Sequence, residues 1–149
     1  MTSLQRTLVL IATLPLTVGC GGPPPPPIVP AGGVVTLNGQ PLPMAQVRFI
    51  PQIDQGAGYI ATGVTDQEGR YELTCDGEPG ACAAATSITV SEGDAPPELM
   101  GENAQRELAV YRKSLKNRPI PTGYASPVSS PLTAEVTADQ AQYDLELTR

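Results

Sequence analysis

The chain has 149 residues, of which 15 are acidic and 9 are basic, and its net charge is −6 without any histidine. A chain of this length can bury one sizeable core, so we expect a single folded domain. The acidic balance argues against nucleic acid as a partner, because nucleic-acid-binding surfaces are basic. It argues equally against electrostatic docking on anionic lipid.

The first twenty residues have the layout of a bacterial secretory signal. Arg6 precedes an apolar run over residues 8–18, and the small residue Gly19 lies directly before Cys20. The end of this segment resembles a lipobox, after which a lipoprotein is cleaved and its new N-terminal cysteine is acylated. The apolar run is shorter than the roughly 20 residues that a membrane-spanning helix needs. We therefore expect residues 1–19 to be a lipoprotein signal peptide, with ordinary secretion or an uncleaved anchor as the alternatives.

Prolines dominate the segment that follows Cys20. Residues 23–27 are all proline, and Pro30 comes soon after. Such a run adopts the polyproline II conformation and acts as a stiff spacer. We expect residues 20–30 to hold the domain off a bacterial membrane, inner or outer, by a lipid on Cys20. A ligand for SH3-like modules is the alternative, but those modules belong to the eukaryotic cytoplasm.

From Ala31 onward, seven short segments alternate apolar and polar residues, which is typical of half-buried strands. Turn-forming residues such as Asn38-Gly39 separate them. The residues on their inner faces are Val35 and Leu37; Ala45, Val47 and Phe49; Ile60, Thr62 and Val64; Tyr71 and Leu73; Ile88 and Val90; Leu132, Ala134 and Val136; Tyr143, Leu145 and Leu147. Seven short strands with turns between them predict an all-β sandwich over residues 31–149.

One segment departs from the two-residue period. Near residues 96–117 the apolar residues recur at spacings of three and four, and basic residues gather at the C-terminal end. We expect a helical insertion there that packs against the sandwich through Leu108, Tyr111 and Leu115. The basic residues have two interpretations. They form the solvated C-terminal end of a helix, or they contact an anionic partner.

Cys75 and Cys82 flank a short loop that contains glycine and proline. In an oxidising compartment, such a pair is most simply a structural disulfide, worth about 2 kcal/mol. A metal or redox pair is the alternative. A metal needs more ligands than this chain offers without histidine, and redox pairs usually have the spacing Cys-x-x-Cys.

The segments 33–42, 45–49 and 65–73 together resemble the carboxypeptidase regulatory-like domain. The resemblance covers nearly all of residues 31–149 and implies a seven-stranded transthyretin-like, Ig-like β-sandwich. The later segments 120–124 and 130–133 resemble those of small bacterial lipoproteins that carry this domain alone. The shared motifs are turn residues and strand alternation, so the resemblance speaks to the fold and hardly to the activity.

We find no catalytic motif in the sequence. Histidine, the commonest general base, is absent, and there is no nucleophile elbow, phosphate-binding loop or zinc-spaced cluster. We therefore expect no enzymatic activity, no cofactor and no metal. The acidic turns at 66–68 and 76–78 offer at most a weak calcium site, but acidic residues at turns are commonly only turn formers.

Aromatic residues are the remaining candidates for ligand binding, because sugars stack on aromatic rings. The chain has no tryptophan, one phenylalanine and five tyrosines. The strand and helix patterns account for most of them, which leaves Tyr59 and Tyr124 as possible ligand-binding residues. We expect a non-catalytic, lipid-anchored cell-envelope protein with a structural or protein-binding role. The alternatives are a polysaccharide-binding module or an accessory subunit of an envelope enzyme or transporter.

Overall fold

The computed structural model describes residue 24, residues 26–54 and residues 56–149, so the predicted signal peptide and Cys20 lie outside the described residues. The described chain forms twelve short strands, three 3-10 turns and one α-helix. The strands are β1 (Ile28–Val29), β2 (Gly32–Leu37), β3 (Gln40–Pro41), β4 (Ala45–Pro51), β5 (Ala61–Val64), β6 (Arg70–Glu72), β7 (Thr74–Cys75), β8 (Glu78–Pro79), β9 (Ala81–Cys82), β10 (Ala85–Glu92), β11 (Thr133–Glu135) and β12 (Leu145–Leu147). The helical elements are η1 (Gly56–Tyr59), η2 (Pro97–Leu99), α1 (Gln105–Ser114) and η3 (Thr122–Tyr124).

The larger sheet has six strands in the order β11-β10-β4-β5-β7-β8. Its centre is the antiparallel pair of β4 and β10, in which Val47 lies opposite Val90 and Phe49 opposite Ile88. These four side chains are buried, whereas the intervening Arg48 is exposed. Alternate side chains of each strand therefore point to opposite faces of the sheet, so the apolar ones pack in the core and the polar ones face water.

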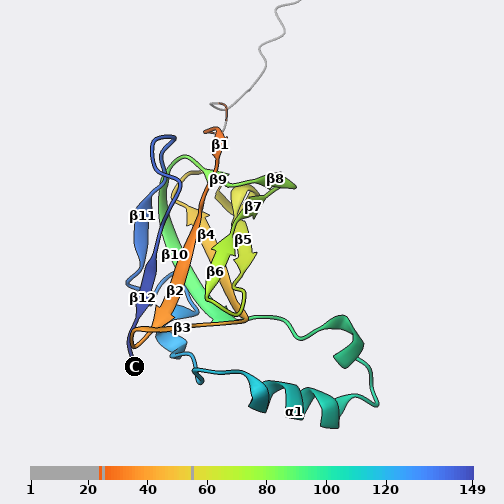
Figure 1. Cartoon of the computed structure of the whole chain (residues 1–149). Helices are drawn as coiled ribbons and strands as arrows, with labels where there is room; N and C mark the ends of the chain where they lie inside the picture. Colours follow the sequence, from red (N-terminus) through yellow and green to blue (C-terminus); the bar gives the residue numbers. More distant parts are fainter. Residues whose placement is uncertain (1–23, 25, 55) are drawn as a thin grey trace, which may run out of the picture.

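The second sheet is built around β2, which pairs parallel with β12 and antiparallel with β3 and β6. The chain passes from this sheet to the larger one at Leu73, because β6 before it pairs with β2 and β7 after it pairs with β5. Leu73 itself is buried. This corner joins the two layers seen in Figure 1 into one sandwich-like body.

An aromatic cluster forms the middle of the core. The Phe49 ring lies 6.3 Å from the Tyr71 ring and 5.8 Å from the Tyr143 ring, centroid to centroid. All three side chains are buried, as the strand pattern predicts. Edge-to-face and tilted contacts of this kind add about 0.5–1.5 kcal/mol per pair to the burial itself.

The all-β class is confirmed, and each of the seven predicted segments overlaps a strand. The number seven is wrong for the described residues, because five further short strands form: β1, β3, β7, β8 and β9. Their sequences are too short to show alternation, so the periodicity gives no signal for them. The pairing also begins at Ile28, where β1 joins β9, and so before the expected start of the domain at Ala31.

The helical insertion is present but differs from the prediction. It consists of η2 and α1, and α1 is shorter than the predicted helix. Residues 100–104 separate the two, and the glycine and asparagine among them disfavour helix. No residue of α1 is buried, and its principal neighbour is η2. The predicted packing of Leu108, Tyr111 and Leu115 against the sandwich is therefore wrong, because the insertion extends away from the body (Figure 1).

The predicted disulfide is also wrong, because Cys75 and Cys82 are both free, buried thiols. Cys75 lies in β7 and pairs with Glu78 across a tight turn. Cys82 lies in β9 opposite Ile28, and its Sγ donates a weak hydrogen bond to the Pro26 carbonyl at 3.5 Å. Each cysteine is thus held by a different strand pair.

Candidate functional site

Two surfaces stand out from the rest of the molecule. One is the insertion at residues 93–118, which we call the arm. The other is a hollow over β2 and β6, which we call the trough and describe below. The described chain begins beside β1 at one end of the body, and the arm leaves the opposite end (Figure 1). A partner bound to the arm would thus lie away from the predicted membrane tether.

Arg118 fastens the C-terminal base of the arm to the body. Its Nε donates to Glu92 Oε2 at 2.6 Å. Its Nη2 donates to the carbonyl oxygens of Pro43 at 2.6 Å and Met44 at 3.2 Å. The guanidinium fork thereby joins the end of β10 to the loop before β4. The side chain is 13% exposed and that of Glu92 is 54% exposed, so the hydrogen bonds contribute more than the ion pair itself.

Asn117 makes a second attachment beside Arg118. Its amide nitrogen donates to the carbonyl oxygens of Leu37 at 3.0 Å and Gln40 at 3.1 Å, which belong to the β2–β3 hairpin. Its backbone has φ 58°, a left-handed conformation that asparagine tolerates better than most residues. Its side-chain oxygen accepts from the Arg149 guanidinium at 3.2 Å. The base of the arm is therefore held at several points, although its tip is free of the core.

The tip of the arm exposes apolar and basic side chains together. Met100 is 66% exposed and Val110 is 62% exposed. Five of the 9 Lys and Arg residues of the chain lie between residues 106 and 118, with Glu107 as the one acidic residue among them. In the described part of the chain the one ion pair joins Arg118 to Glu92, so the other arm cations are not paired there. The C-terminal half of the arm is thus basic, whereas Asp94, Glu98 and Glu102 make its N-terminal half acidic.

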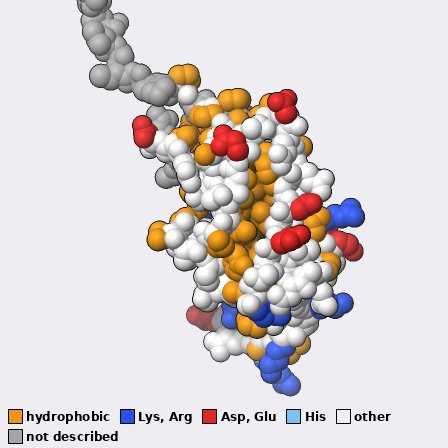
Figure 2. Space-filling model, turned by 90° about the vertical axis from the view of Figure 1, so that its left-hand side faces the viewer, with side chains coloured by type: hydrophobic (Ala, Val, Ile, Leu, Met, Phe, Trp, Pro, Cys, Tyr) orange, Lys and Arg blue, Asp and Glu red, His pale blue; other side chains and the backbone are white. Residues whose placement is uncertain are grey.

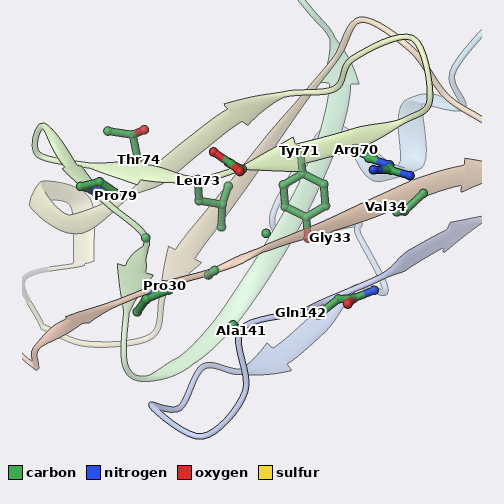
Figure 3. A pocket seen from close by; sticks show the side chains of 14 residues that line it. Pro30, Gly33, Val34, Arg70, Tyr71, Leu73, Thr74, Pro79, Ala141 and Gln142 are labelled. Atoms are coloured by element: carbon green, nitrogen blue, oxygen red, sulfur yellow. The ribbon is translucent and has the colours of Figure 1, made fainter.

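The trough is a hollow of about 820 Å³ along β2 and β6. Gly32 and Gly33 line it where β2 closely approaches its neighbours: a Cβ on Gly32 would collide with the carbonyl of Tyr71, and a Cβ on Gly33 with the carbonyl of Tyr143. Figure 3 shows the Tyr71 ring reaching from β6 toward Gly33, with Ala141 and Gln142 on the other side. The Tyr71 hydroxyl donates to the Tyr143 carbonyl at 2.5 Å, so this ring covers the glycine from the inside.

The charged residues that line the trough are Glu72 and Arg70, and further carboxylates lie near it. Glu72 lines it from β6, and Glu78 directly precedes the lining residue Pro79. Asp144 accepts a hydrogen bond from the Val34 amide at 3.0 Å, which places a third carboxylate beside the floor. Arg70 is the one basic residue among the lining residues.

Figure 2 shows how charged and hydrophobic side chains are distributed over one side of the molecule. It faces the β11–β12 side, where a band of hydrophobic side chains runs along the body with acidic side chains beside it. Lys and Arg side chains gather toward the end that is far from the tether. By sequence, residues 93–118 hold five basic and four acidic residues, so the arm is close to neutral whereas the body is acidic.

Three titratable groups of the body have pKa values above their ordinary range. Burial raises the pKa of Tyr71 far above its ordinary range, and the charges of Asp144 and Tyr143 raise it further. Its hydroxyl therefore stays a hydrogen-bond donor. Burial likewise raises the pKa of the Cys82 thiol. Burial also raises the pKa of the Cys75 thiol, and the nearby Cys82, Asp76 and Glu78 raise it further. A buried thiol with a raised pKa is a poor nucleophile.

The structure places the predicted ligand residues Tyr59 and Tyr124 apart from both surfaces. Tyr59 ends η1 and packs partly buried against the core. Tyr124 lies in η3, and its hydroxyl accepts from the Thr148 amide at 3.1 Å, so it pins the C-terminal strand. Neither lines the trough. The lipidation site Cys20 lies outside the described residues.

No group of three or more His, Cys, Asp or Glu side chains in the described ranges is placed to hold a metal ion. Nor does this part of the chain contain a helix long and apolar enough to cross a membrane.

Sequence reasoning singled out the helical insertion and its basic end, but it missed the trough and the contacts that attach the arm to the body. Consecutive glycines in a strand, as at Gly32 and Gly33, can signal a close approach of the backbone to another group. The residues Asn117 and Arg118 carry no comparable signal, because their partners lie far away in the sequence.

No known family model matches the chain, and neither a curated protein nor a solved structure is similar to it.

Proposed function

We propose that this chain is a non-catalytic, lipid-anchored protein of a bacterial cell envelope that binds a protein partner through its arm. The observation that carries the proposal is the position of α1, a helix without a buried residue at the end of the body opposite the tether. The lipid on Cys20 and the proline tether would fix one end of the molecule to a membrane. The other end would present the arm to a partner.

The way in which the arm is attached supports this role. An insertion that served only as a connection would not need the carbonyl contacts of Arg118 and Asn117. These contacts fix where the arm leaves the body, which lowers the entropy that its ordering costs on binding. The exposed Met100 and Val110 supply the apolar area that a partner can cover.

For the body, we propose the transthyretin-like topology of the carboxypeptidase regulatory-like domain. The supporting features are its two β layers and the strands that overlap all seven predicted segments. In such a scaffold the sheets hold the surfaces in place and contribute no chemistry of their own.

A polysaccharide in the trough is the second candidate function. The volume of about 820 Å³ falls within the range of small-molecule sites. Against it stands the lack of an exposed ring there, because Tyr71 is only 3% exposed and its hydroxyl is already bonded. The protein-binding arm therefore has the stronger support.

The anchoring is tested with the full-length chain in a bacterial host. We expect the protein in the membrane fraction and an acylated N-terminal peptide that begins at Cys20, and Cys20→Ser should release it from the membrane. An unmodified cysteine in a secreted protein would contradict the lipid anchor.

The binding role is tested with a photo-crosslinking amino acid at Val110 of the arm. The matched control is Val128, which is 95% exposed but lies on the body. We expect a protein adduct from position 110 that is absent at 128. Equal labelling, or none from either position, would contradict a protein-binding arm.

A further inference from the structure

Residues 26–31, which we call the strap, are bound to the body, although the sequence predicts a spacer up to residue 30. The Pro27 carbonyl accepts a hydrogen bond from the Ala83 amide at 2.9 Å, and the Ala31 carbonyl accepts one from the Leu73 amide at 3.0 Å. Between these two bonds, β1 pairs with β9. The strap is therefore held to the body at both ends and in the middle.

The strap covers the thiol of Cys82. Ile28 lies opposite Cys82 in the β1–β9 pair, and the Pro26 carbonyl accepts the hydrogen bond of its Sγ at 3.5 Å. Among the described strands, β1 is the one pairing partner of β9, and yet Cys82 is only 2% exposed. Val29 of the strap is buried as well. The strap thus forms one wall of the space that holds this thiol.

Gly80 lies so close to the strap that no side chain has room there. A Cβ on Gly80 would collide with the Val29 carbonyl, and the φ of Gly80 is 125°. Gly77, in the turn before it, also has a positive φ, of 82°, but a Cβ there would meet nothing within 4 Å. A side chain at Gly80 therefore pushes on the strap, whereas one at Gly77 strains only its own turn.

The strap shortens the tether that the sequence predicts. With a lipid on Cys20, five residues, 21–25, lie between the anchor and the strap. An extended chain spans at most about 3.6 Å per residue, so the strap lies within about 20 Å of the anchor. A tether free as far as Gly32 could span about 40 Å. The arm leaves the other end of the body, so its height above the membrane depends on the strap (Figure 1).

The strap is also a weaker attachment than the strand that follows it. β1 has two residues and pairs with β9, whereas β2 pairs with β3, β6 and β12. Local opening begins where few backbone bonds and few apolar contacts hold a segment. A pull between the anchor and a partner on the arm would therefore open the strap before it disturbs β2.

We propose that the strap is a releasable lock between the tether and the body, which sets the height at which the arm meets its partner. This rests on the proposed lipid anchor and protein-binding arm, and it adds that the partner lies at a restricted distance from the same membrane. Release of the strap frees six more residues of tether and uncovers the Cys82 thiol at the same time. The reactivity of Cys82 therefore reports whether the lock is closed.

Thiol labelling of the full-length protein in membranes tests the lock. A maleimide is added to the folded protein, and mass spectrometry of its peptides follows each cysteine separately. In the unchanged protein we expect Cys82 to label slowly, as the fully buried Cys75 does. Gly80→Ala and Val29→Ser should each raise the labelling rate of Cys82 about tenfold or more, because that rate follows the open population. Cys75 should stay protected, which shows that the body is folded.

The matched control is Gly77→Ala, which strains a left-handed backbone without contact to the strap. It should leave the labelling of Cys82 unchanged. Fast labelling of Cys82 in the unchanged protein, or its protection in both strap variants, would overturn the lock. If Cys75 labels as fast as Cys82 in both variants, the strap and the core open together, and a separate release of the strap is overturned.

Energy transfer from a dye at Val110 of the arm to acceptors at the membrane surface tests the height. Transfer should be lower in Gly80→Ala than in the unchanged protein, because the longer tether lets the arm lie farther from the membrane. Equal transfer in the two proteins would overturn the role of the strap in setting the height. A Cys20 thiol that labels with maleimide would instead contradict the lipid anchor, while Cys82 in the same sample still decides whether the strap is closed.

Discussion

The body and the arm use apolar side chains in opposite ways. In the body, Leu37, Phe49 and Leu147 are no more than 1% exposed, whereas Met100 and Val110 of the arm are more than 60% exposed. Burial of a large apolar side chain contributes about 1.5–3 kcal/mol, so the body supplies the stability of the fold. The apolar residues of the arm contribute little to it. The arm therefore leaves apolar area exposed, which is the basis of the binding role proposed for it.

The two regions also differ in how they are held. The body is held by strand pairing and by the aromatic cluster around Phe49. The arm is held at its base by polar contacts, chiefly those of Arg118 and Asn117. Removal of a core contact should therefore destabilise the whole body, whereas removal of a contact at the base of the arm should loosen only the arm. The following changes test this difference.

The largest expected effect comes from a matched pair of glycine substitutions. Gly33→Ala forces a Cβ against the carbonyl of Tyr143, and we expect a loss of about 3 kcal/mol or more. Gly101→Ala in the arm meets open space, and its effect should stay within about 1 kcal/mol. Urea unfolding measures both. Equal midpoints for the two variants would contradict the separation of body and arm.

A second matched pair compares leucines. Leu147 of β12 is 1% exposed, so Leu147→Ala leaves a cavity and should cost about 2–5 kcal/mol. Leu108 of α1 is not buried, and Leu108→Ala should cost less than about 1 kcal/mol. Thermal unfolding would show the difference. A large effect of Leu108→Ala would mean that the arm belongs to the core after all.

Removal of the Arg118 contacts, here called the clamp, should have an intermediate effect. Arg118→Gln breaks the bonds to Glu92, Pro43 and Met44, and we expect a loss of about 1–2 kcal/mol. Amide exchange at the base of the arm should become faster while exchange in β4 and β10 stays slow. The control is Arg112→Gln, an exposed arm cation, which should change stability by no more than about 0.5 kcal/mol. Slow exchange throughout in Arg118→Gln would show that the arm does not depend on this clamp.

The smallest effect at neutral pH comes from the buried ionisable groups of the body. Folding raises the pKa of Cys75, Cys82 and Tyr71, so their contribution is complete below the pKa values of the unfolded chain. Unfolded cysteine ionises near about 8.5 and tyrosine near about 10. Stability should therefore decline as pH rises above about 8.5 and decline further above about 10.

Cys82→Ala should remove part of the first decline and leave the second, which belongs to Tyr71. The free energy of unfolding in urea, measured between pH 7 and 11, checks both steps. A stability that does not change over this range would be the contrary result.

The strands of the body could be predicted from the sequence because alternation is a local property. The alternation at Val35 and Leu37, or at Tyr71 and Leu73, predicts which side chains face the core even when the partner strand is unknown. Whether Cys75 and Cys82 form a disulfide could not be predicted from such a local pattern. The spacing of Cys75 and Cys82 says that they are close in the chain, but β7 and β9 pair with different neighbours and keep the thiols apart.

The sequence showed the basic, apolar composition of the arm but not its position. A helical stripe predicts that some surface covers Leu108 and Tyr111, and packing on the same chain is the simplest expectation. The attachment at Arg118 decides otherwise, and it depends on the carbonyls of Pro43 and Met44, which lie some 75 residues earlier in the chain.

By itself, the sequence determined the all-β class, most of the core and an apolar signal that ends at a cysteine, because these are written in periods and motifs of a few residues. Only the tertiary structure decided that the thiols stay free, that the arm extends from the body and that Gly32 and Gly33 line a trough. These features arise where distant segments meet, as when Asp144 accepts the Val34 amide across a separation of 110 residues. Local patterns carry no information on such pairings, because the strand order that creates them is settled by the packing of the whole core.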